Sequence, residues 1–311
     1  MSNIQDRAAR LIALPESGDY FKFTDDRQRD LQNLLSGLFL DEPDTPSPLL
    51  ALSAPARVDL DEQTNIPVLV ASIASGLRSW QVNFTTNLHV FVRDSSSGKL
   101  RVAEPLVNMR RGKVPLLSGK GDPPDKLDAI SWSAGVNWFD LQAKVPQTYA
   151  KGQIAVTAVA HDVRSNSVVM ELDSAKSPPD VPLPAPQPYV RPVVDKSPIS
   201  TAQVALTGAL IRISAPIPGN SVRDLASEHP LCSLNVVLIQ LDEKPVIIPV
   251  TTPAQRRPDA DGKQVWRAAF EVDLPAAAET QLAGEYQVYV DLGDELIGPY
   301  LFSHIHRSGH Q

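Results

Sequence analysis

A charged stretch at residues 108–131, NMRRGKVPLLSGKGDPPDKLDAIS, is the first group of side chains that could carry function. Its first half is basic and its second half is acidic, and it lies between segments of strand pattern, where long loops often hold recognition residues. The alternative is a solvated loop without a ligand, because the spacing of a phosphate-binding loop is absent. We take as candidate partner contacts Arg110, Arg111, Lys113, Lys120, Asp122, Asp125 and the adjacent Trp132.

Two smaller groups have the side chains of metal ligands. Asp259 and Asp261 precede Gly262 as the first residues of a calcium loop do, but calcium takes about six to eight oxygen ligands and the later ones are missing, so a plain hairpin turn is favoured over a calcium site. His304 and His306 are two residues apart, which puts them on one face of a strand, whereas the alternative is a polar tail. We expect no cofactor, with calcium or a transition metal as the alternative.

No motif specifies a reaction. The separate histidines His89, His161 and His229 show no metal-binding spacing, and a nucleophile elbow of the form Gly-x-Ser-x-Gly is absent. Cys232 is the only cysteine and lies just before an apolar run, so it is expected to be a buried hydrophobic residue rather than a nucleophile. The sequence therefore favours a protein that is not an enzyme.

Composition and charge limit the classes of partner and the cellular compartment that we expect for this protein. The net charge of −7 gives no basic surface for nucleic acid. The N-terminal residues lack the pattern of a secretory signal, and no run approaches the roughly 20 apolar residues of a membrane span. We expect a soluble cytoplasmic protein, with signal-independent export left open, and a protein partner in an unknown oligomeric state.

The elements that must position these groups begin with helices. Residues 3–14 place apolar side chains at helical spacing up to Pro15. A second helix follows Thr24, with an apolar stripe formed by Leu31, Leu34, Leu35 and Leu38. The stripe is expected to pack on the following domain, and a docking helix for a partner groove is the alternative.

Short strands dominate the rest of the chain. The strands expected in the first half are 58–60, 66–73, 80–84, 88–92, 100–107, 138–145 and 154–161, with a hairpin turn at 95–99. Residues 173–200 hold eight prolines, which favour an extended spacer that forms no packed element.

Three blocks recur in the same order on both sides of this spacer. Residues 87–107 match 233–252, WFDLQAKVP matches RAAFEVDLP with Pro146 opposite Pro275, and YAKGQIAVTAV matches QLAGEYQVYV. Such ordered repetition indicates an internal duplication.

We therefore predict an all-β chain with two tandem immunoglobulin-like β-sandwich domains and a short α-helical N-terminal extension. The expected boundaries are 1–46 for the extension, 49–173 and 201–305 for the sandwiches, 174–200 for the linker and 306–311 for the tail. The favoured function is a non-catalytic protein–protein interaction or scaffold protein. The alternatives are a calcium-dependent or carbohydrate-binding adhesive module, and a metal-dependent enzyme or accessory subunit that uses the C-terminal histidines.

Overall fold

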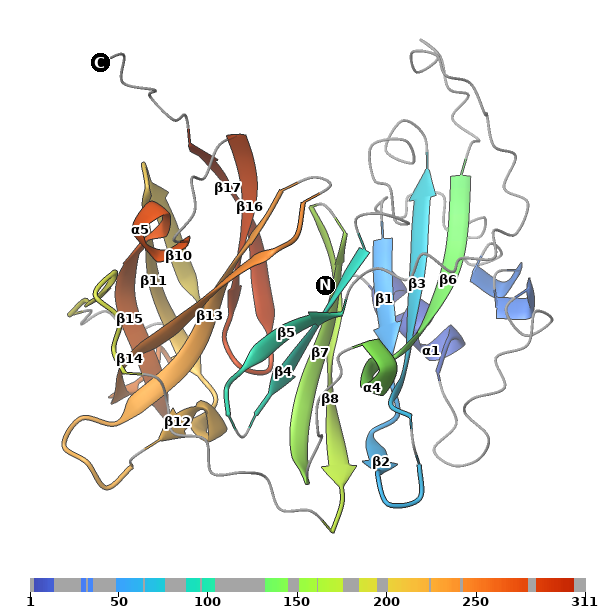
Figure 1. The fold of residues 1–311 in the computed structure, drawn as a ribbon, viewed down its shortest axis with the longest axis horizontal. Helices are drawn as coiled ribbons and strands as arrows, with labels where there is room; N and C mark the ends of the chain where they lie inside the picture. The colour runs from blue at the N-terminus through green and yellow to red at the C-terminus, as the bar shows by residue number, and fades with distance from the viewer. Residues whose placement is uncertain are drawn as a thin grey trace. The chain divides into compact units, whose positions relative to one another are not determined.

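The fold is taken from a computed structural model and is drawn in Figure 1. The structure describes residues 3–13, 29–31, 33–35, 49–63, 65–75, 88–95, 97–103, 132–144, 151–160, 162–175, 185–194, 201–223, 225–240, 243–278 and 284–304. Strands account for most of these residues and the helices are few and short, so the chain is all-β, as the sequence predicts.

The elements follow one another along the chain in this order: α1 (Asn3–Leu11), β1 (Leu49–Ser53), β2 (Arg57–Asp59), β3 (Pro67–Ser75), β4 (Leu88–Asp94), β5 (Leu100–Ala103), β6 (Trp132–Asp140), α4 (Leu141–Lys144), β7 (Gly152–Ala160), β8 (Val163–Asp173), β9 (Val190–Pro192), β10 (Gln203–Thr207), β11 (Leu210–Ile217), the 3₁₀ turn η1 (Gly219–Ser221), β12 (Val222–Arg223), β13 (Leu231–Ile239), β14 (Val246–Pro258), β15 (Gln264–Asp273), α5 (Leu274–Ala278), β16 (Gly284–Asp291) and β17 (Leu296–His304).

The chain divides into two units. Unit 1 holds residues 1–92 and 102–177, and unit 2 holds residues 93–101 and 178–311. Unit 1 contains a three-stranded sheet in the order β1-β3-β6 and a second sheet in the order β2-β8-β7-β4-β5, of which the end of β4, the turn and the first half of β5 are counted with unit 2. Unit 2 contains β10-β11-β15, which continues through β14 into β13-β16-β17. Seven strands of each unit thus occupy matching places in the same chain order.

The core of unit 1 lies between its two sheets. Alternate side chains of β3, such as Val68 and Val70, face this core together with Phe139 of β6 and Met170 of β8. This alternation follows from the two-residue period of a strand. Helix α1 is attached to unit 1 by Gln5, whose side-chain amide donates hydrogen bonds to the carbonyls of Leu50 and Arg164.

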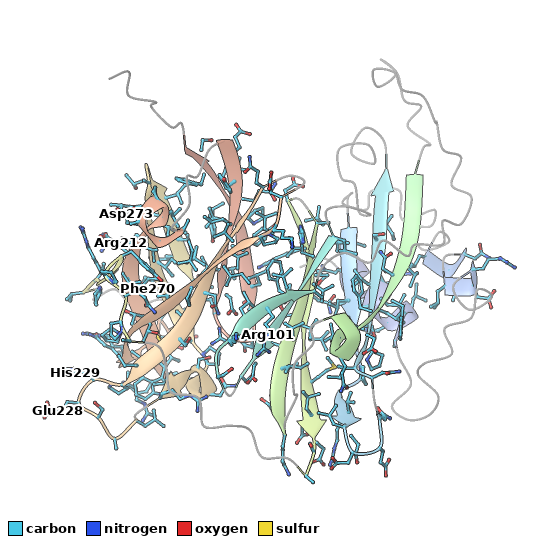
Figure 2. All side chains as sticks on the ribbon, in the orientation of Figure 1. Arg101, Arg212, Glu228, His229, Phe270 and Asp273 are labelled. Atoms are coloured by element: carbon cyan, nitrogen blue, oxygen red, sulfur yellow. The ribbon has the colours of Figure 1, made fainter. Side chains whose placement is uncertain are left out.

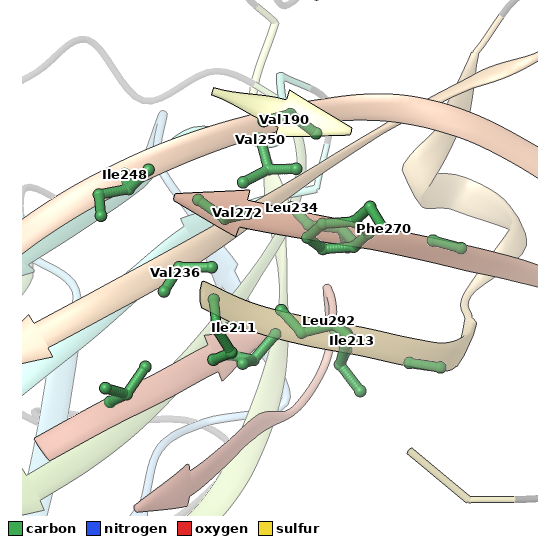
Figure 3. Close-up of a cluster of buried hydrophobic side chains, with 14 of the residues drawn as sticks. Val190, Ile211, Ile213, Leu234, Val236, Ile248, Val250, Phe270, Val272 and Leu292 are labelled. Carbon is green, nitrogen blue, oxygen red and sulfur yellow. The ribbon is translucent and has the colours of Figure 1, made fainter. Parts of the chain in front are cut away.

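Unit 2 encloses one continuous core because β14 belongs to both sheets. Residues 246–253 pair with β13 and residues 254–258 pair with β15. Figure 3 shows Ile211 and Ile213 of β11 in this core with Phe270 of β15 and Val250 of β14.

The expected strand at 138–145 is wrong in its second half. β6 ends at Asp140 and the short helix α4 begins at Leu141, just as β15 ends at Asp273 and α5 begins at Leu274. Leu141 and Leu274 are both fully buried, and Asp140 and Asp273 each accept a hydrogen bond from a backbone N–H of the helix that follows. The match that placed Pro146 opposite Pro275 is therefore four residues out of register.

The proline-rich segment differs from the expected spacer at residues 187–193. β9 pairs antiparallel with β15, the N–H of Val193 donates to the carbonyl of Ala269, and the side chain of Val190 lies in the core (Figure 3). Pro192 is tolerated because an edge strand can lack one backbone donor. Tyr189 and Val190 supply the apolar side chains that such a strand needs.

The N-terminal helical residues pack on unit 1, as expected from their apolar spacing. Leu31 and Leu35 are buried together with Ala8 of α1 and Ile12 just after it, whereas Leu34 is 52% exposed. The rest of the expected second helix, with Leu38, lies outside the described residues, as does the expected strand 80–84. Among the described residues, no helix is long and apolar enough to cross a membrane.

Candidate functional site

The charged loop that the sequence singles out lies outside the described residues. This applies to Arg110, Arg111, Lys113, Lys120, Asp122 and Asp125. The loop leads into β6, whose first residue, Trp132, is the register partner of Ser75 at the end of β3. The backbone of Trp132 is described but its side chain is not, so its candidate role stays a prediction.

Asp259 and Asp261 lie in the turn of the β14–β15 hairpin. The Asp259 carboxylate accepts hydrogen bonds from the N–H groups of Asp261 at 3.0 Å and Lys263 at 2.8 Å. Gly262 adopts a φ of +80°, a conformation that glycine accepts without a steric penalty. The geometry is that of the hairpin turn that the sequence favours over a calcium loop.

The histidine pair is divided between described and undescribed residues. His304 is the last residue of β17 and its side chain is not described, while His306 lies outside the described residues. Within the described part of the chain, no group of three or more histidine, cysteine, aspartate or glutamate side chains could hold a metal ion.

A buried polar cluster in unit 2 was not predicted from the sequence. Arg93 is only 2% exposed, and its Nη1 donates to Asp291 Oδ2 at 2.5 Å while its Nη2 donates to the carbonyl of Ser233 at 2.6 Å. Asn235 Nδ2 donates to the same Asp291 oxygen at 2.7 Å, and the N–H of Gly293 donates to Oδ1 at 3.1 Å. Asp291 is therefore a hydrogen-bond acceptor inside unit 2.

The turn at Gly98 packs closely against β13 beside this cluster. At Gly98, which has a φ of +69°, an added Cβ would lie 2.8 Å from the Cβ of Ser233. The side chain of Asn235 also donates to the carbonyl of Gly98 at 3.2 Å. In the sequence, Gly98 in the turn between β4 and β5 is the one local sign that another segment comes close here. The sequence does not show that this segment is the one with Ser233.

Burial shifts the pKa of two potentially reactive side chains, His89 and Cys232. Burial lowers the pKa of His89 on β4 from 6.5 to about 4, so the imidazole is neutral at neutral pH. Burial raises the pKa of the Cys232 thiol to about 12, and its Sγ lies 3.4 Å from the carbonyl of Thr252 as a donor. Cys232 is the buried hydrophobic residue that the sequence predicts.

A small surface hollow of about 220 Å³ lies on unit 2 beside β9, β11, β15 and α5. Its lining includes Tyr189, Arg191, Glu271 and Asp273. Figure 2 shows Asp273 and Arg212 on the same side of this unit. Pockets that enclose drug-sized ligands measure about 300–1,000 Å³, so the hollow is smaller than such a site.

The outer face of the β1-β3-β6 sheet is the surface that best fits a binding role. It presents the side chains of Leu49, Ala51, Leu69, Ala71, Ile73 and Val136, which are buried beneath the N-terminal helical residues. Figure 1 draws α1 beside this sheet, and α1 contacts β1. The continuous apolar runs of β1 and β3 are the sequence signal for strands buried on both faces. Trp138 is partly buried and packs on this outer face as well.

The corresponding sheet of unit 2 carries a charged pair at one matching place on its outer face. Because Pro67 pairs with Asp140 and Leu210 pairs with Asp273, the two sheets can be compared residue by residue. Leu69 opposite Trp138 in unit 1 then corresponds to Arg212 opposite Glu271 in unit 2.

The two cross-strand pairs differ in chemistry as well as in environment. The Arg212 and Glu271 side chains approach to 3.9 Å and are 54% and 30% exposed. Leu69 is fully buried. We call the outer surface of β1, β3 and β6 the helix-covered face.

Comparisons with known proteins assign no family. No protein-family model matches the sequence, and no curated protein matches it. Among solved structures, the chain is similar to a red sea bream transglutaminase, with 10% identity over 93% of this chain and a TM-score of 0.21, and it spans 34% of that chain. It is also similar to a serine-rich repeat adhesion glycoprotein from Streptococcus agalactiae, with 8% identity over 84% of this chain and 96% of that chain and a TM-score of 0.18. Similarities this weak carry no argument about function.

Proposed function

We propose that this chain is a non-catalytic protein–protein interaction or scaffold protein built from two immunoglobulin-like sandwiches that arose by internal duplication. The proposal is supported by the shared order of seven strands and by the strand-to-helix joint that both units repeat at Asp140–Leu141 and Asp273–Leu274. Sandwich folds of this kind host many functions, so the surfaces must carry the argument.

The observation that carries the proposal is the divergence of one surface between the two units. The core positions Val68 and Val70 keep their apolar character as Ile211 and Ile213, while Leu69 between them corresponds to the charged Arg212. In unit 1 this face holds the N-terminal helical residues, so the outer surface of such a sandwich can serve as a contact surface. We assign further partner contacts to the 108–131 loop and Trp132, and the proposal requires no cofactor.

Affinity capture from a native extract, followed by mass spectrometry, tests the proposal. We expect the full chain to retain a protein partner, and we expect the triple variant Arg110→Glu, Arg111→Glu, Lys113→Glu to retain less of it. Calorimetry with calcium and a glycan array test the adhesive alternative in parallel. A chain that retains no protein but releases heat with calcium or binds glycans would overturn the scaffold proposal.

A further inference from the structure

One sheet edge differs between the two units. Among the described strands, β1 in unit 1 pairs with β3 and β10 in unit 2 pairs with β11, so each lies at the edge of its sheet. Leu52 of β1 is the register partner of Val70. The core position that matches Val70 is Ile213, whose register partner is Val204 of β10. Val204 therefore corresponds to Leu52.

In unit 1 this edge is closed by side chains. Asn166 donates from Nδ2 to the carbonyl of Leu52 at 2.9 Å, and its Oδ1 accepts from the N–H of Leu52 at 2.8 Å. Gln5 donates to the carbonyl of Leu50 at 2.7 Å. The backbone groups of Leu50 and Leu52 thus point away from β3, and side chains occupy the place that a further strand would take.

Unit 2 has a glycine at the place of Asn166. Leu172 and His304 are the register partners of the matching glycines that begin β7 and β16. Asn166 lies six residues before Leu172, and Gly298 lies six residues before His304. Gly298 therefore corresponds to Asn166, and it has no side chain that could bind the edge. β8 packs beside β1, whereas among the described elements β17 makes no comparable approach to β10.

β10 is consequently an edge strand with open backbone groups. By the match with Leu52, the N–H and C=O of Val204 point away from β11, and those of Leu206 do so two residues later. Within the described part of the chain, no side chain is bonded to these outward groups. The strand QVALT also lacks the charges and prolines that keep sheet edges from pairing, whereas β9 contains Arg191 and Pro192.

A second copy of β10 complements this edge. An antiparallel pair centred on Ala205 has two-fold symmetry. It puts Val204 of one copy opposite Leu206 of the other, and both of these side chains pack against the core of their own unit. It puts the exposed Gln203 opposite the exposed Thr207. Apolar side chains thus meet apolar ones, polar side chains meet polar ones, and no charges are opposed.

We propose that β10 is a self-association edge, at which two copies of this chain join their sheets through antiparallel β10 strands. The inference goes beyond the proposed function, because it names a second copy of the chain as the partner. A pair of five-residue strands buries less than the roughly 1,200 Å² at which stable interfaces begin, so the dimer is weak and reversible, with a Kd of about 10–500 μM.

Sedimentation velocity of the full chain, from about 1 μM to about 500 μM, measures the association. We expect the sedimentation coefficient to rise with concentration toward that of a dimer. Ala205→Lys should weaken association at least about tenfold, because it puts like charges opposite each other at the two-fold axis. Gln264→Lys adds the same charge at an exposed place on β15 and should associate as the wild type does.

Both lysine variants should keep the β-sheet circular dichroism of the wild type, because both positions are exposed. A wild-type chain that sediments as a monomer at every concentration would overturn the proposal. Equal weakening by Ala205→Lys and Gln264→Lys would overturn it as well.

Cysteine cross-linking tests the register of the pair. Ala205→Cys puts two Cβ atoms about 4.5–5.5 Å apart across the axis, so mild oxidation in air should give a covalent dimer. Thr207→Cys alone should not, because its thiol faces Gln203 of the other copy, but a mixture of Thr207→Cys and Gln203→Cys chains should. Cys232 is buried and does not compete. If Thr207→Cys alone forms dimers as readily as Ala205→Cys, the antiparallel pairing is wrong.

Discussion

His89 is a buried imidazole in unit 1, with Nδ1 lacking a hydrogen-bond partner among the described atoms and a side chain that is 6% exposed. Its pKa of about 4 lies below the ordinary 6.5, so between these values the unfolded chain binds more protons than the folded chain. The stability contributed by neutral His89 is complete above pH 6.5 and is lost as the pH falls toward 4.

We predict that the titration of His89 lowers the free energy of unfolding by at most about 3 kcal/mol between pH 7.5 and pH 4. Urea unfolding at both pH values measures the effect. In His89→Gln the acid-dependent loss should shrink by that amount, whereas the exposed His229→Gln should behave as the wild type. A His89→Gln chain with the wild-type pH dependence would contradict the buried neutral imidazole.

The Arg93–Asp291 pair is the most buried ion pair among those described, with side chains 2% and 5% exposed. Removing either partner leaves an uncompensated buried charge, so Arg93→Met and Asp291→Asn should each lower the free energy of unfolding by about 3–5 kcal/mol. A double-mutant cycle should show strong coupling, because the double variant has no buried charge at this place. The exposed pair Arg212→Met and Glu271→Gln is the control, with coupling below about 1 kcal/mol.

Cys232 gives a simple reporter of folding. Its buried thiol with a pKa of about 12 should not react with a thiol reagent in the folded chain at pH 8, because the thiolate is the reactive form. We expect less than one-hundredth of the labelling rate of the urea-unfolded chain, measured by absorbance. Rapid labelling in buffer would show that β13 opens readily.

At the scale of elements, β9 shows how a segment read as a spacer becomes part of a sandwich. Val190 is buried in the unit 2 core, while Val194, four residues later, is 69% exposed. Val190→Asp should destabilise unit 2 by about 2–4 kcal/mol because it buries an unpaired carboxylate, and Val194→Asp should change stability by less than about 0.5 kcal/mol. Thermal unfolding followed by circular dichroism measures both, and equal melting temperatures would mean that β9 is not docked.

The strand-to-helix joints explain why one repeat block was misaligned. Both WFDLQAK and EVDLPAA contain Asp-Leu, which marks the joint. The sequence comparison aligned the blocks on Pro146 and Pro275 instead, because proline is the more obvious end of a strand. The joint is set instead by the buried Leu141 and Leu274, whose N–H groups donate to the carbonyls of Ile66 and Ala209. Those carbonyl partners lie far away in sequence, so no local pattern could locate the joint.

At the scale of the whole molecule, the units are not two uninterrupted stretches of chain. Unit 2 includes residues 93–101, so a fragment of residues 178–311 lacks the arginine that pairs with Asp291. We predict that Asp291→Asn costs the fragment less than about 0.5 kcal/mol, because its carboxylate is then open to water, while costing the full chain several times more. Urea unfolding of both backgrounds measures this difference, and equal costs would contradict the assignment of residues 93–101 to unit 2.

Local patterns by themselves determined the all-β class, the amphipathic helical extension, the burial of Cys232 and the hairpins that recur in both halves. Each of these depends on the period of side chains along one element, or on turn residues next to it. The cytoplasmic location, the loop contacts and the histidine site stay predictions.

Only the tertiary structure decided which faces are covered and which charges are paired. Arg93 and Asp291 lie 198 residues apart, and Val190 of β9 lies 82 residues from Val272, its register partner on β15. Whether an outward side chain such as Leu69 or Arg212 is buried depends on what else packs on that sheet, and distant segments supply that layer. The two-residue periodicity of a strand determines which side chains share a face. Which segment packs against that face, if any, depends on the tertiary structure.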